Sequence, residues 1–390
     1  MTQKMGSVSY TRYEDIDQAA LQKDIDAIKD TIPAPNWDDF QHLLKLERWG
    51  SGAVFAGISL IGVVSFWDMS GIAFTFLALL SGLLIGIGNT FRWANVTHPI
   101  LHGAYDKVSN IPYRYTKSGF ARGFNRYFDW LDWIKPEAWE FEHNIMHHYH
   151  LGEDDDPDNV ERNMKWLTTS NTPMFLRYVI IAILAATWKF TYYAPNTLRI
   201  LENKERRKRK EPELDYYEWS PLKKNGLELW KNYYLPYGIG KFVLLPLVFW
   251  FPFGWVGVAN AFGILLLSEL IANVHSFIVI VPNHSAEDIY QFSEPHKTQG
   301  EFYLRQIMGS VNYHTGSDLI DASQGFLNYQ IEHHLFPNMP HSFYQQMQPI
   351  VKDICKKYDL EYRQESVFKR AWMTVELMVG KTKVLRADGV

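Results

Sequence analysis

Cysteine is almost absent from this chain, since Cys355 is the only one among 390 residues. A single thiol excludes an internal disulfide framework and any zinc or iron–sulfur site built on several cysteines. An excess of basic residues is also missing, because 39 Lys and Arg stand against 43 Asp and Glu, a formal net charge of −4. This balance argues against a nucleic-acid-binding protein, which normally carries a strongly basic face. The N-terminal sequence MTQKMGSVSYTRYEDID lacks the apolar core of a signal peptide, so nothing there indicates secretion.

Charged residues are nearly missing from two long stretches. Residues 49–91 contain one charged residue, Asp68, and residues 242–283 contain one, Glu269. A helix that crosses a bilayer needs ~20 apolar residues, so each stretch has the length of two crossings. We expect turns at WDMSG (67–71) and within PFGWVGVANAFG (252–263). The prediction is an all-α, polytopic integral membrane protein with four transmembrane helices in two hairpins; a pair of core helices in a soluble protein is the alternative.

The basic residues indicate how the hairpins are oriented. Every Lys and Arg lies outside the two stretches, and the positive-inside rule then places both termini and the segment 92–241 in the cytoplasm. The expected parts are an N-terminal cytoplasmic or interfacial segment (1–48), a first transmembrane hairpin (49–91), a cytoplasmic helical cap (92–241), a second transmembrane hairpin (242–283) and a cytoplasmic C-terminal region (284–390).

Three further segments have a recognisable pattern. FLRYVIIAILAATWKF (175–190) has only 11 residues between Arg177 and Lys189, too few to cross a bilayer, so we interpret it as an interfacial or cap helix. Residues 12–31 have a modest amphipathic helical pattern and are expected to lie on the membrane or on the cap. The charge run LENKERRKRKEPE (201–213) is better explained as a solvated helix end than as a site for anionic lipid headgroups or a phosphorylated substrate.

The histidines are the most informative residues in the sequence. Of fourteen, eight fall into four clusters: His98 and His102 in HPILH, His143, His147 and His148 in HNIMHH, His284 in VPNHS, and His333 and His334 in QIEHH. Residues four apart share one face of a helix, so the first two clusters each present a pair of imidazoles. In the predicted topology all four clusters emerge on the same side of the membrane. His150 is a further possible member, and we expect His42, His296, His314 and His341 at the surface or in supporting positions.

Eight converging imidazoles indicate a metal centre. They are too many for one catalytic zinc ion, which uses three protein ligands and one open position. They suit two metal ions with positions left open for oxygen or substrate, and imidazole is compatible with iron, copper or zinc.

The three boxes HPILH, HNIMHH and QIEHH resemble the histidine boxes of the membrane fatty-acid desaturase family. HHYHLGEDDDPD (147–158) is similar to the family's second box with the Asp-Pro-Asp that often follows it. The segment GFLNYQIEHHLFPNMPHSFYQQMQPIVKDICKKYDLEY (325–362) resembles the C-terminal part of front-end acyl desaturases, in which glutamine replaces the first histidine of the third box. The similarity in order and spacing extends from about residue 49 to residue 362. One departure is Pro99, which disfavours helix at His98.

The resemblance implies two iron ions as cofactors, held by His98, His102, His143, His147, His148, His284, His333 and His334. It makes Gln330 a weak ligand or a hydrogen-bond partner, and His284 rather than His275 the lone histidine between the second and third boxes. Carboxylates should orient ligating histidines through their other ring nitrogen, and Asp154, Asp155, Asp156 and Asp158 are close in sequence. Glu269 lies within a predicted span, where it is expected to partner His275 or Asn273, or to be a neutral side chain near the outer turn.

The function implied is an O2-dependent desaturase that introduces a cis double bond into a fatty acyl chain carried by CoA, acyl-carrier protein or a lipid. No residue beyond the metal ligands is then needed as a catalyst. Front-end enzymes often carry a fused cytochrome b5 domain with a His-Pro-Gly-Gly motif, which this sequence lacks. We therefore expect a separate electron donor, a ferredoxin or cytochrome b5 with its reductase. Two alternatives remain: a di-iron hydroxylase of acyl chains, alkanes or carotenoids, and a non-catalytic membrane scaffold that binds structural zinc.

Overall fold

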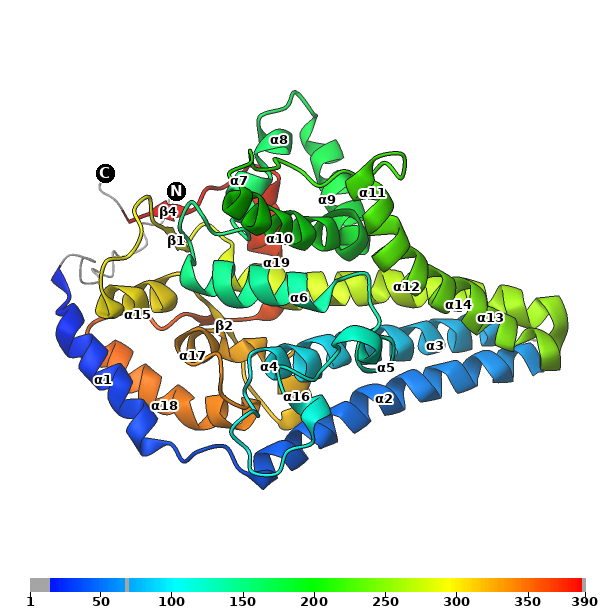
Figure 1. Cartoon of the computed structure of the whole chain (residues 1–390), viewed down its shortest axis with the longest axis horizontal. Coiled ribbons are helices and arrows are strands. Elements are labelled where there is room, and N and C mark those ends of the chain that lie inside the picture. The colour runs from blue at the N-terminus through cyan, green and yellow to red at the C-terminus, as the bar shows by residue number, and fades with distance from the viewer. Residues whose placement is uncertain (1–14, 67–69, 388–390) are drawn as a thin grey trace, which may run out of the picture.

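The computed structural model describes residues 15–66 and 70–387. Three long helices form its elongated part: α2 (Trp37–Phe66), α3 (Gly71–Phe91) and α14 (Trp250–Ile280). Figure 1 shows them side by side, with the end of α2, the start of α3 and the start of α14 at the same end of the molecule. The predicted turn at 67–71 lies between α2 and α3, although residues 67–69 are outside the described part.

Small residues let these helices approach closely. A Cβ atom on Gly88 of α3 would lie 2.6 Å from the carbonyl oxygen of Gly50 on α2. A Cβ atom on Gly86 would lie 2.8 Å from the carbonyl oxygen of Ser268 on α14. Helices in a membrane gain stability from such close packing, since lipid provides no hydrophobic drive between them.

Within the described residues, four helices are long and apolar enough to cross a membrane: Trp37–Phe66, Gly71–Leu101, Met174–Arg209 and Trp250–His284. Three of them overlap the predicted spans. Met174–Arg209 overlaps none of them. We expected an interfacial or cap helix there, because the charge of Lys189 should end the apolar segment. Lys189 is instead 3% exposed and pairs with Asp132, with 2.5 Å between Lys189 Nζ and Asp132 Oδ2. The helix therefore continues through α9 (Met174–Trp188), η6 (Lys189–Tyr193) and α10 (Ala194–Arg209).

The arm that precedes α14 differs from the predicted boundaries. The chain turns at Phe249–Gly254, where Gly254 has a φ of 61° that glycine adopts without strain. Since only residues 242–248 of the predicted hairpin come before this turn, the arm starts further back, at Lys224, within the segment that we assigned to the cap. It consists of α11 (Lys224–Leu229), η7 (Trp230–Tyr234), α12 (Leu235–Ile239), η8 (Gly240–Leu244) and α13 (Leu245–Val248).

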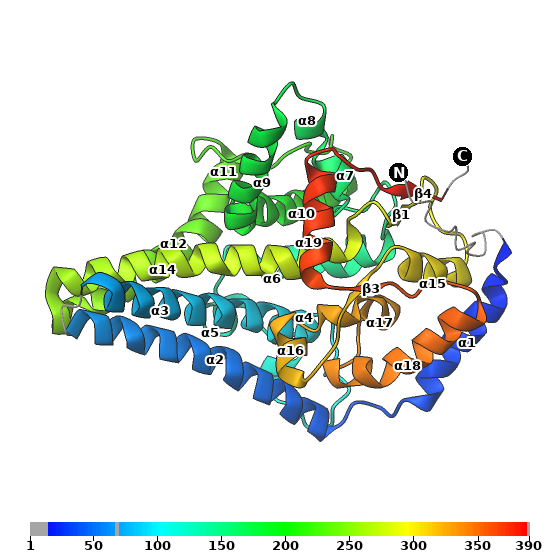
Figure 2. The ribbon, with the colours of Figure 1, turned by 180° about the vertical axis from the view of Figure 1, so that it is seen from behind.

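A helical cap covers the other end of the long helices (Figures 1 and 2). Its larger helices are α1 (Gln18–Thr31), α15 (Gln299–Met308), α18 (His341–Lys357) and α19 (Val367–Met378). The amphipathic α1 packs on α15 and α18, so of its two predicted positions it takes the one on the cap. Figure 2 shows α19 crossing from the neighbourhood of α7 towards α14, both of which it contacts.

Shorter elements complete the cap. They are η2 (Arg92–Thr97), α4 (His98–Leu101), η3 (Tyr113–Tyr115), η4 (Gly123–Asn125), α5 (Arg126–Asp129), α6 (Pro136–Glu140), η5 (Phe141–His147), α7 (Val160–Asn163), α8 (Lys165–Thr168), η9 (Val281–His284), α16 (Asp318–Ser323), η10 (Leu327–Tyr329) and α17 (Gln330–Leu335). In the charge run that ends α10, Arg207 pairs with Glu213 and Lys208 with Glu205. This mutual neutralisation favours the solvated helix end over a lipid-binding site.

Strands are confined to two short parallel pairs. β1 (Tyr290–Gln291) pairs with β4 (Leu385–Arg386), and β2 (Asn312–Tyr313) pairs with β3 (Gln364–Glu365). The second pair positions the third histidine box, because the Asn312 side-chain oxygen accepts a hydrogen bond of 2.8 Å from the backbone N–H of Ile331. The described chain is otherwise helical or irregular, in agreement with the predicted fold class.

Candidate metal centre

The first histidine box lies where α3 changes into the π-helical segment η2. This wider turn precedes Pro99, which lacks an N–H group, and the N–H of His98 bonds to the carbonyl of Trp93, five residues back. The N–H of His102 then bonds to the carbonyl of His98 at 3.1 Å. Pro99 therefore leaves the i, i+4 pair intact, and both imidazoles are buried.

The second box lies on η5, another π-helical segment, which continues α6. The rings of His143 and His147 are stacked, with centroids 5.4 Å apart. His148 points in another direction and stacks on His334 of the third box, with centroids 4.2 Å apart. The second and third boxes thus meet across nearly 190 residues of sequence.

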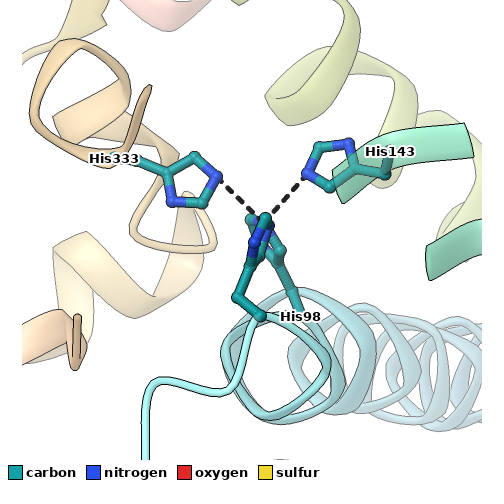
Figure 3. Close-up of side chains that lie close together, drawn as sticks. His98, His143 and His333 are labelled. Atoms are coloured by element: carbon teal, nitrogen blue, oxygen red, sulfur yellow. Dashed lines mark hydrogen bonds between the residues drawn. The ribbon is translucent and has the colours of Figure 1, made fainter. Parts of the chain in front are cut away.

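The structure gathers all eight predicted histidines in one place. One group holds His98, His102, His143 and His333, and another holds His147, His284 and His334; within each group, one nitrogen per residue lies within 4.8 Å of the others. His148 lies between the groups, with its ring centroid 4.8 Å from that of His143. Figure 3 shows three of these rings converging: His98 Nε2 is 3.1 Å from His333 Nε2 and 3.2 Å from His143 Nε2.

Hydrogen bonds to the outer ring nitrogens fix the tautomers. His284 Nδ1 is 2.9 Å from the carbonyl oxygen of Gly309, and His334 Nδ1 is 2.8 Å from Gln306 Oε1. A carbonyl oxygen only accepts, so each Nδ1 carries the proton and each Nε2 offers a lone pair. His333 Nδ1 likewise lies 3.0 Å from the Tyr344 hydroxyl.

The inner nitrogens are suited to metal ions. Among the described residues, His102 Nε2, His334 Nε2 and both ring nitrogens of His148 are buried without a hydrogen-bond partner. An unsatisfied buried polar group costs about 1–3 kcal/mol, a cost that a coordinated ion would offset. Burial, followed by the neighbouring histidines, lowers the pKa of His102, His148 and His334 well below its ordinary value, so these rings are neutral, as ligands must be. The residues therefore fit a pair of metal ions.

Of the four carboxylates expected after the second box, Asp156 is the one that supports His147 most closely. Asp154 is exposed. Asp156 is buried, and its carboxylate lies 3.0 Å from His147 Nδ1. Burial lowers the pKa of His147, but the Asp156 carboxylate outweighs this effect, so the pKa of His147 is raised. Asp158 is 3.9 Å from the same nitrogen and forms a third potential metal group with His143 and His147.

Two of the remaining candidates lie apart from the centre. His275 Nε2 donates to the carbonyl of Ser323 at 2.8 Å, outside the two histidine groups. Glu269 is paired with Lys241 at 2.5 Å and accepts from Asn273 at 3.2 Å. Its expected partner Asn273 is therefore confirmed, whereas His275 as its partner, and the neutral side chain near the outer turn, are wrong. Gln330 belongs to the site, since its amide nitrogen is 2.8 Å from His284 Nε2.

Sequence reasoning missed several buried residues around the histidines. Tyr344 and Gln306 orient His333 and His334. Glu142, directly before the second box, is buried beside Tyr193, with 3.2 Å between its carboxylate and the Tyr193 hydroxyl. Burial, followed by Asp158, raises the pKa of this carboxyl group. Only Glu142 gave a signal, its position next to His143.

An apolar cavity of about 290 Å³ lies against the histidines. His98, His143, His147 and His284 form part of its wall, and the rest is mainly aromatic and aliphatic. Trp166, which is 60% exposed, and the exposed Thr191 mark its opening, while Trp93 and Phe277 are buried deep in the wall. The arrangement can hold a flexible apolar chain beside metal ions and keep water away from it.

Comparisons with known proteins agree with this site. Residues 74–366 match the model of the fatty acid desaturase family. The chain is 25% identical over 321 residues to an NADPH-dependent stearoyl-CoA 9-desaturase of Mycobacterium tuberculosis, covering 78% of this chain and 68% of that protein. It is 22% identical over 325 residues to an sn-1 linoleoyl-lipid 6-desaturase of Arthrospira platensis, covering 80% of each.

A shorter match, 33% identical over 108 residues, relates 28% of this chain to 23% of Delta(8)-fatty-acid desaturase 1 of Arabidopsis thaliana. The family match covers well over half of the chain and includes all three histidine boxes. This chain belongs to the fatty acid desaturase family, whose members are oxidoreductases.

Proposed function

We propose that the protein is an O2-dependent di-iron acyl desaturase of the front-end type, which inserts a cis double bond into a fatty acyl chain. The observation that carries the proposal is the apolar cavity whose wall contains four of the eight gathered histidines. Further support comes from relatives named for the 6 and Delta(8) positions and from the glutamine that opens the third box, Gln330.

Each group of histidines would hold one ion. His98, His102, His143 and His333 would bind the first, His147, His284 and His334 the second, and His148 lies close enough to serve either. Two bound iron ions would supply O2-dependent dehydrogenation. In the overall reaction, one O2 is reduced to two waters by two hydrogens from adjacent methylenes together with two electrons and two protons from a donor system. The acyl carrier and the donor, a ferredoxin or cytochrome b5, are separate molecules.

The protein's own residues select the methylenes. Methylenes in a saturated chain are chemically alike, so only their distance from the metal centre can distinguish them. The aromatic wall of the cavity holds the chain in place and excludes water. Asp156, Gln306 and Tyr344 keep the ligating rings in the orientation that points their inner nitrogens at the ions.

The test is expression in a host with a compatible reductase, followed by mass spectrometry of the acyl chains and location of double bonds by derivatisation. His333→Ala should abolish the product and lower the iron content of the purified protein. His314→Ala is the matched control, because His314 is exposed and outside both histidine groups. A new double bond between an existing one and the carboxyl end establishes the front-end type.

Other outcomes separate the alternatives. A hydroxylated chain would identify an acyl hydroxylase with the same ligands. Bound zinc without iron, together with unchanged acyl chains, would identify a non-catalytic metal-binding scaffold and refute the proposed activity.

A further inference from the structure

A second cavity, of about 360 Å³, lies between the α2–α3 hairpin and the arm that contains α12 and η8. Its aliphatic wall includes Ile58, Ile85 and Leu265, and its polar end includes Arg92 and Lys241. No residue lines both this cavity and the one beside the histidines. The second cavity therefore has no place in the proposed reaction as described so far.

Two stacked tryptophans separate the cavities. Trp93 lines the cavity beside the histidines, and Trp130 lines the second one. Their ring centroids are 6.3 Å apart with an angle of 25° between the planes, so the two indoles lie roughly parallel and offset from each other. Trp93 is 3% exposed and Trp130 is 4% exposed. The two buried rings therefore stand side by side in the part of the protein that separates the cavities.

An ion pair holds this wall in place. Lys189 Nζ lies 5.1 Å from the centre of the Trp93 ring and 2.5 Å from a carboxylate oxygen of Asp132, two residues after Trp130. A buried ammonium group over an indole ring is attracted to its face. One side chain therefore anchors both halves of the wall, and Trp130 also lies edge-on to Trp139.

We propose that the Trp93–Trp130 pair is a specificity determinant that limits how long an acyl chain the protein accepts. The inference rests on the proposed function, since it takes the first cavity to be the acyl site. A chain that enters past Trp166 meets Trp93 at the buried side of that cavity. Removal of the Trp93 ring would join the two cavities and add the aliphatic surface around Ile58 and Ile85 to the binding site.

The experiment supplies acyl chains of graded length that already carry a double bond, as the front-end reaction requires, to wild type, Trp93→Ala and Trp130→Ala. It measures both turnover and the longest chain retained in native mass spectrometry. Each newly buried methylene contributes about 0.8 kcal/mol, so preference for a chain two carbons beyond the wild-type limit should rise about tenfold. Trp93→Phe, which keeps a ring, should shift the limit less. Ile58→Phe added to Trp93→Ala should partly restore it by filling the second cavity.

Trp255→Ala is the matched control, since Trp255 is 71% exposed and lines neither cavity. If Trp93→Ala and Trp93→Phe still bind acyl chains and have an unchanged length limit, the proposed role of the Trp93–Trp130 pair would be refuted. If wild type binds acyl chains without forming product, the proposed activity would be refuted. A shift in the length limit of the variants would then still support the role of the Trp93–Trp130 pair. Failure of wild type to retain any acyl chain would refute both.

Discussion

At the scale of single residues, hydrogen bonds decide which ring nitrogen of a histidine is left free to bind a metal ion. The Tyr344 hydroxyl lies 3.2 Å from the carbonyl oxygen of Phe336, to which it donates its only proton. Its oxygen must then accept from His333 Nδ1, 3.0 Å away, which leaves His333 Nε2 unprotonated. A neutral tyrosine thus sets the tautomer of a ligand, a role that box spacing in the sequence does not reveal.

Tyr344→Phe should lower iron content and activity, because the ring of His333 loses its anchor while the aromatic packing stays. Loss of such a supporting bond typically costs 10–100-fold in metal affinity or activity. Iron per polypeptide, measured by elemental analysis of purified protein, checks this. Tyr329→Phe is the control, since the Tyr329 hydroxyl bonds to Asp321 instead. Equal iron content in both variants would contradict the role of Tyr344.

Asp156→Asn should weaken metal binding by a similar factor of about 10–100, because His147 loses the carboxylate that orients it. Asp154→Asn, two positions away on the exposed side of the same loop, should leave binding unchanged. Titration of the metal-free variants with iron compares the two. A loss in Asp154→Asn as large as in Asp156→Asn would show that the negative charge of the loop, and not one carboxylate, is responsible.

At the scale of elements, the α2–α3 hairpin was predictable and the arm before α14 was not. Charge-free length is a reliable signal, and it identified α2, α3 and α14. The same counting failed at Lys189 and Lys241, because each is buried in an ion pair with a residue distant in sequence, Asp132 or Glu269. A charged residue ends an apolar segment only if its side chain must reach water. The local sequence does not show whether a buried residue of opposite charge is present to pair with it.

Lys241→Met should destabilise the protein by about 3–5 kcal/mol, since it leaves the buried carboxylate of Glu269 without its cation. The double variant Lys241→Met/Glu269→Gln should recover part of the loss. The exposed pair of Lys208 and Glu205 provides the comparison, with an expected effect of about 0–1 kcal/mol for Lys208→Met. Thermal unfolding in detergent would show the difference, and similar melting temperatures for both single variants would contradict it.

At the scale of the whole molecule, the meeting of the histidine boxes was predictable from topology alone. His98 and His284 follow the predicted spans closely, and the other two clusters lie in segments predicted on the same side of the membrane. The sequence thus predicted their convergence, and the structure brings all eight rings together. The division into two groups and the choice of Asp156 over Asp154 depend on side-chain directions and could not be predicted. The glutamine at 330 was recognised through the family resemblance rather than through spacing.

The expected orientation can be tested with single cysteines in a Cys355→Ala background, because the native cysteine is buried. Ile72→Cys lies at the exposed start of α3, and Lys208→Cys lies on the cap helix α10. An impermeant maleimide added to intact cells should label position 72, whereas position 208 should react only after the membrane is opened. The reverse pattern would place the metal centre on the outer side.

The spread of the ligands along the chain has a consequence for biosynthesis. The first two boxes emerge from the ribosome well before His333 and His334, which lie nearly 190 residues further along the chain than the second box. Tyr344 and the helix α18 that carries it come later still, and α18 then packs against α1 from the beginning of the chain. Neither histidine group is complete before this point. Metal ions that need every ligand of either group could therefore enter only after the third box has been made, which makes metal loading a late step in maturation.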